Sequence, residues 1–149
     1  MTRRADFRDL SDATGKRLWT ELATTWGFAS DKEYWFPLTD SSREDVSAFQ
    51  APYFHRAMND GALVAALKAR SIDRVIEFRE GGGTYELAVE DLDADYTGEE
   101  GYWSAPPWDW VVYASHESSV TVGGQWLINA VQSVWPQWRQ HIWTSPNFR

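Results

Sequence analysis

The sequence predicts one α+β domain, in which an antiparallel sheet of about four strands packs against N-terminal helices and a C-terminal helix. Two observations predict this class. Apolar residues recur with a helical period in the first half of the chain and near its end, and they alternate with period two in between. The 149 residues have the usual size of a single domain, so residues 1–149 are assigned to one.

The first helix is expected over residues 11–26. Three apolar residues spaced four apart lie on one face of this segment: Leu18, Leu22 and Trp26. Ser11 or Asp12 can cap the start of the helix, and Gly27 can end it.

Two more helices are expected in the first half. The capping-box pattern Ser41-x-x-Glu44 predicts a short helix that runs through Phe49 and ends before Pro52. Residues 61–70 carry a narrow apolar stripe and follow a polar pair that can cap a helix.

Strands are expected mainly in the second half. Residues 74–79 and 84–90 alternate and are joined by three glycines, which predicts a hairpin. Residues 110–115 and 120–122 predict a second strand pair. A short edge strand is expected at residues 34–36, which precede a proline.

The C-terminal helix is expected from about residue 124 to residue 135, with Leu127, Val131 and Val134 on one face. Helices from both ends of the chain are expected to cover one face of the sheet. The longest stretch without periodicity is 91–107, and an irregular stretch of this length in a small domain is typically functional or mobile.

Charge divides the chain unevenly. Residues 1–79 hold 12 Lys/Arg and 12 Asp/Glu, whereas residues 80–138 hold ten Asp/Glu and no Lys or Arg. The net charge is -8. Such a field repels phosphate backbones and attracts cations, so we expect a basic protein partner and no direct contact with nucleic acid.

The acidic stretch and the tryptophans beside it form the predicted partner-binding face. Tryptophan is enriched at the centres of interfaces, and two prolines would stiffen the chain beside the acids. The predicted contact residues are Asp91, Asp93, Asp95, Glu99, Glu100, Trp103 and Trp108. The alternative for the tryptophans is that they fill the core, since Trp108 and Trp110 share one side of a strand.

A small enzyme or ligand-binding domain is the alternative function, with a pocket near Asp109, His116 and Glu117. No catalytic residue is assigned. Ser115, His116 and Glu117 are adjacent on an extended chain and point to opposite faces, so they cannot form a triad with one another. A structural subunit that buries its tryptophans against identical copies is a third alternative.

No metal or other cofactor is expected. The chain has no cysteine, and its histidines match no recognised metal spacing: His55, His116 and His141. Asp91-x-Asp93-x-Asp95 has calcium-ligand spacing, but Tyr96 and Tyr102 stand where an EF-hand needs glycine and glutamate.

Residues 110–117, 120–126 and 135–138 resemble small bacterial immunity proteins, which are partners of secreted toxins. The resemblance covers about the last 40 residues and lies in short aromatic strands, acidic surface and a terminal helix. It implies a non-catalytic inhibitory protein that occludes the active site of a basic toxin, and it carries no residue assignment. No apolar segment follows the early positive charge, so no secretory signal and a cytoplasmic location are expected.

Overall fold

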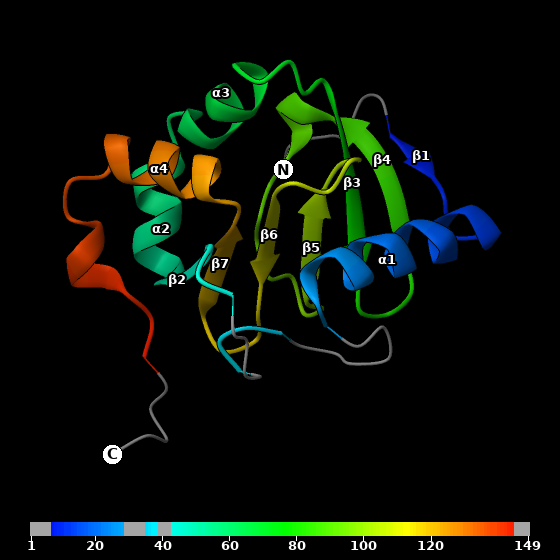
Figure 1. Cartoon of the computed structure of the whole chain (residues 1–149), viewed down its shortest axis with the longest axis horizontal. Helices are drawn as coiled ribbons and strands as arrows, with labels where there is room; N and C mark the ends of the chain where they lie inside the picture. The colour runs from blue at the N-terminus through cyan, green and yellow to red at the C-terminus, as the bar shows by residue number, and fades with distance from the viewer. Residues whose placement is uncertain (1–6, 29–34, 39–42, 145–149) are drawn as a thin grey trace.

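The computed structural model describes residues 7–28, 35–38 and 43–144, and it contains a seven-stranded antiparallel sheet (Figure 1). The order across the sheet is β1-β4-β3-β5-β6-β7-β2. The strands are β1 (Arg8–Asp9), β2 (Val46–Gln50), β3 (Arg74–Arg79), β4 (Thr84–Ala88), β5 (Gly101–Ser104), β6 (Val111–Ala114) and β7 (Ser119–Gly123). The α+β class is confirmed, and the expected number of about four strands is wrong.

The helices in the described residues are α1 (Ala13–Trp26), α2 (Ala51–Met58), α3 (Ala62–Lys68) and α4 (Gln125–Val134), with 3₁₀ turns η1 (Val89–Asp91) and η2 (Trp138–His141). Three of the α-helices confirm predicted ones. At the start of α1 the Asp12 side chain accepts the Thr14 N–H at 2.9 Å, and Gly27 ends the helix with φ 78°. Helix α2 was not predicted from the sequence.

The sheet is covered on both faces, which corrects the expectation that helices would cover one. One core holds residues of α1, including Leu18, Leu22 and Trp26, and the other holds residues of α2, α3 and α4, including Phe54, Leu67 and Leu127. In Figure 1, α2, α3 and α4 gather together on the left, away from α1 on the right.

Strand β6 buries apolar side chains on both faces of the sheet, so helices must cover both faces. Val111 and Tyr113 point into the core beneath α1, whereas Val112 and Ala114 point into the core of the other three helices, and all four are buried. A strand buried on both faces has a nearly continuous apolar sequence. The apolar run at 111–114 carries that signature, although an exposed face was expected.

Strand β2 replaces the helix expected to run through Phe49. All five of its residues pair with β7, from Val46 opposite Gly123 to Gln50 opposite Ser119. Pro52 lies in the first turn of α2, where its missing N–H costs nothing, so this proline begins a helix rather than following one. Ser41 lies outside the described residues.

The other differences involve short segments. Trp35 and Phe36 form no strand, and Tyr34 lies outside the described residues. β5 lies within the stretch 91–107, which was expected to be irregular, and β1 contains only two residues. Strands this short carry too few positions for alternation to be recognised.

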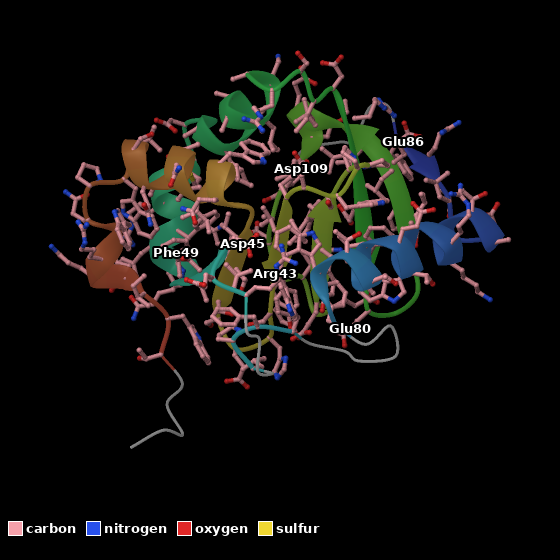
Figure 2. All side chains as sticks on the ribbon, viewed as in Figure 1. Arg43, Asp45, Phe49, Glu80, Glu86 and Asp109 are labelled. Atoms are coloured by element: carbon pink, nitrogen blue, oxygen red, sulfur yellow. The ribbon has the colours of Figure 1, made fainter. Side chains whose placement is uncertain are left out.

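The antiparallel order brings several connections to one end of the sheet. β2, β3 and β6 end there, whereas β4, β5 and β7 begin there. We call this the loop end, formed by residues 80–83, 95–100 and 115–118. Figure 2 shows Glu80 at the loop end and Asp109 at the opposite end of the sheet.

Candidate functional site

Arg79 ties residues 92–100, which we call the acidic loop, to the sheet. Its side chain is 9% exposed, and its Nη1 donates to the backbone carbonyls of Asp95 and Glu99, each at 3.2 Å. Its Nε donates to Glu77 at 3.0 Å, and its guanidinium lies 4.9 Å from the ring centroid of Trp103. The last cation before the acidic run is therefore turned inward, where it orders the backbone of the loop.

Trp103 and Trp108, both predicted to contact a partner, are core residues. Trp103 is fully buried and donates its Nε1 N–H to Glu77 at 3.0 Å. Trp108 is 5% exposed and donates its Nε1 N–H to Glu21 of α1 at 3.1 Å. Both side chains fill the core, as the alternative prediction for the tryptophans stated. Neither is available to a partner in this structure.

Glu100 is buried beneath the loop end rather than displayed on it. Its Oε1 accepts the Tyr113 O–H at 2.6 Å, and its Oε2 accepts the backbone N–H of His116 at 3.0 Å and contacts His116 Nδ1. The hydrogen bond to Glu100 raises the pKa of His116 above its usual value, and burial raises the pKa of Tyr113. Glu100 is thus a structural acceptor for three donors.

His116 lies between two carboxylates. Its Nε2 is 3.2 Å from Glu117 Oε2, on the side away from Glu100, and its side chain is 45% exposed. Glu80 joins the same network, because its Oε1 accepts the Glu100 backbone N–H at 2.6 Å and its own N–H donates to the Glu100 carbonyl at 3.0 Å. The turn after β3, the acidic loop and the turn after β6 are therefore fixed to one another.

Exposed acids remain at the surface of this network. Glu80 and Glu99 are exposed, and neither has an ion-pair partner within residues 7–28, 35–38 and 43–144. The Glu99 carboxylate lies over the turn, since a Cβ built on Gly81 would come 2.5 Å from Glu99 Oε2. By contrast, Glu86 and Glu90 on the β4 side are paired with Arg8, Arg74 and Lys68.

The five acids predicted as one face occupy different environments. Asp91 is half-buried at the end of η1, which follows β4 at the end of the sheet opposite the loop end. Asp93 is exposed, Asp95 is half-buried, and Glu99 is exposed at the loop end. Glu100 is fully buried, so of the five predicted acids only Asp95 and Glu99 reach the surface of the loop end, where Glu80 joins them.

A cavity of about 250 Å³ opens beside this surface, between the start of α2, the acidic loop and the turn after β6. The polar residues that line it are His55, Asp95, Tyr96, Ser115, His116, Ser118 and Ser119. His55 Nε2 lies 3.0 Å from Asp95 Oδ1, and the buried hydroxyls of Ser115 and Ser119 are 2.6 Å apart. His55 was not predicted as a site residue, because no sequence pattern predicted the helix that carries it.

The alternative pocket predicted from the sequence is only partly assembled. His116 lines the cavity, and Glu117 touches His116 from outside it. Asp109 is exposed at the other end of β6, where its backbone carbonyl accepts the Trp126 Nε1 N–H at 3.2 Å. Asp109 therefore takes no part in this site.

No protein-family model matches the chain, and neither a curated protein nor a solved structure matches it. Among the described residues, no group of three or more His, Asp and Glu side chains is placed to hold a metal ion. The same part of the chain has no helix long and apolar enough to cross a membrane.

The chemistry of the loop end is that of an acceptor surface. Both ring nitrogens of His116 and Nε2 of His55 face carboxylates, so these donors are already engaged. A carboxylate accepts hydrogen bonds at about four lone-pair sites, which leaves Asp95, Glu80 and Glu99 with capacity for further donors. The arrangement suits a ligand that carries positive charge and N–H groups.

Proposed function

We propose that this chain is a non-catalytic inhibitory protein of the immunity type, which presents the loop end of its sheet to a basic protein partner such as a toxin. The observation that carries the proposal is the placement of charge. The exposed carboxylates of Glu80 and Glu99 gather at the loop end, while the side chain of Arg79 there is only 9% exposed and committed to internal hydrogen bonds. The cytoplasmic location expected from the sequence accompanies this proposal.

Two physical effects would make such a surface useful. A concentrated negative field speeds the encounter with a basic partner and helps to select it. The bonds from Arg79 to the loop carbonyls, together with those between Glu80 and Glu100, hold the loop before a partner arrives. Less conformational entropy is then lost on binding, so more of the interaction energy appears as affinity.

The enzyme alternative has one observation in its favour, because His116 has a raised pKa and lines a cavity. A general base, however, needs a ring nitrogen that can reach a substrate proton. Both nitrogens of His116 face carboxylates, and Asp109 lies at the other end of the sheet. The inhibitory function is therefore the better supported of the two.

A pair of charge variants tests the proposal. In Glu80→Gln/Glu99→Gln two exposed acids of the loop end become neutral, whereas the control Glu86→Gln/Glu90→Gln removes the same charge from the β4 side. Wild type and both variants serve as baits for basic proteins in a lysate of the source organism at low salt. The association rate of the retained protein is then measured against ionic strength.

The loop-end variant should associate several-fold more slowly than wild type and with a weaker salt dependence, and the control should lie close to wild type. Equal rates for the two variants would refute the assignment of the face. A retained protein that keeps its full activity in the complex would refute inhibition.

A further inference from the structure

The cavity beside the acidic surface is too small for a typical drug-sized ligand. Its volume of about 250 Å³ lies below the roughly 300–1,000 Å³ of pockets for drug-sized ligands. Its walls come from α2, the acidic loop and the turn after β6, and the carboxylate of Asp95 is part of them. A single side chain of a protein partner matches this size.

The polar lining favours a cation over an anion. An anion is best held by charged donors, but Nε2 of His55 and both ring nitrogens of His116 are directed at carboxylates. The exposed hydroxyls of Ser118 and Tyr96 also line the cavity, and they carry no charge. Ser115 and Ser119, which are 2% and 1% exposed, hydrogen-bond to each other. Asp95 uses one oxygen for His55, and an ionised carboxylate can accept from several donors at once.

The remaining walls suit a long side chain with a planar cationic head. Ala51, Pro52, Ala114 and Val120 provide an apolar surface for a methylene stem. Tyr96 also lines the cavity and is 44% exposed, so its ring face can receive a cation. A guanidinium combines stacking on an aromatic ring with a fork of donors for a carboxylate, which an ammonium does not.

We infer that this cavity receives an arginine side chain of the basic partner, with Asp95 accepting from the guanidinium and Tyr96 stacking on it. This inference rests on the proposed function, since it names the group of the partner that the same end of the sheet would bind. The exposed acids Glu80 and Glu99 would then speed the encounter, and the cavity would fix the register of the complex.

The test uses the full chain with ¹³C-labelled histidine and the probe N-acetyl-arginine methylamide. Binding should shift the His55 and His116 imidazole resonances saturably at millimolar probe concentrations. The matched probe is the citrulline analogue, which has the same shape without the charge and should bind at least tenfold more weakly. Asp95→Asn should weaken arginine binding by tenfold or more, and Tyr96→Ala by about threefold.

Asp93→Asn is the matched control, since it removes one exposed acid of the same loop that does not line the cavity. Its affinity for the arginine probe should stay within twofold of wild type. Equal binding of the citrulline probe, or an unchanged affinity in Asp95→Asn, would overturn the inference. So would inorganic phosphate that shifts the same resonances and displaces the probe.

The experiments distinguish a failure of the arginine-cavity inference from a failure of the proposed inhibitory function. If the arginine probe causes no shift while partner association still depends on Glu80 and Glu99, the cavity assignment fails and the inhibitory function stands. If association with the partner does not depend on these acids, the proposed function fails, whatever the probe does.

Discussion

Replacing Glu100 by alanine should destabilise the fold strongly, although its neighbour Glu99 should tolerate the same change. The Glu100 carboxylate is fully buried and accepts from the Tyr113 hydroxyl and the His116 backbone N–H at 2.6 and 3.0 Å, with His116 Nδ1 as a third contact. Alanine removes all three acceptor contacts at once. Glu99 is exposed, and its carboxylate lies over a surface turn.

The loss of stability in Glu100→Ala can be estimated from the groups that lose their acceptor. Tyr113 is fully buried, so its unpaired hydroxyl costs roughly 1–3 kcal/mol. His116 also loses its charged acceptor, but this adds less to the destabilisation because the imidazole is half-exposed and water can reach it. Together with the cavity left by the deleted side chain, the free energy of unfolding should fall by about 3–5 kcal/mol.

Urea denaturation measures this loss. With an m value of about 2 kcal/mol/M, the midpoint should fall by about 1.5–2.5 M in Glu100→Ala and by less than about 0.3 M in Glu99→Ala. Adding Tyr113→Phe to Glu100→Ala should cost less than Tyr113→Phe costs alone, since phenylalanine leaves no orphaned hydroxyl. Equal midpoints for the two alanine variants, or additive effects in the double variant, would refute the reasoning.

Two further predictions concern the cations of the loop end. In Arg79→Met the amides of residues 92–100 should exchange hydrogen roughly 10- to 100-fold faster relative to the amides of β6, since bonds from the guanidinium to two loop carbonyls are lost; unchanged relative exchange would show that the loop is held by other contacts. The raised pKa of His116 means that its contribution to stability is fully present below its usual pKa of 6.5 and is lost as the pH rises through the folded-state pKa. Wild type should therefore exceed His116→Gln in thermal stability most at about pH 5–6 and less at pH 8–9, and a difference that grows with pH would contradict the ion pair with Glu100.

The elements that sequence analysis predicted correctly are those with several turns or a complete alternation. The spacing of Leu18, Leu22 and Trp26 marks α1 because one buried face repeats over three turns. The hairpin of β3 and β4 is recognisable because two alternating runs flank three glycines. The boundary between β2 and α2 was not predictable in this way, since pairing with β7 overrides the local capping pattern.

At the candidate site, the sequence predicted the sign of the charge but not the direction of each side chain. Glu99 and Glu100 are adjacent and chemically identical, yet one is exposed and the other is buried at the entrance to β5. In β3, Glu77 occupies a polar position of an alternating strand, which predicts exposure. Its burial is compensated by hydrogen bonds from Trp103 and Arg79, and these partners come together only in the folded sheet.

The buried charges of the loop end bear on how it would recognise a partner. Buried ion pairs add little net stability compared with apolar residues, because desolvation offsets the attraction. Their effect here is geometric: Glu77 positions Arg79, Arg79 holds the loop carbonyls, and Glu100 aligns the turn that carries His116. A surface fixed in this way lets the exposed acids act from defined positions, so specificity for one basic partner would depend on residues that the partner never touches.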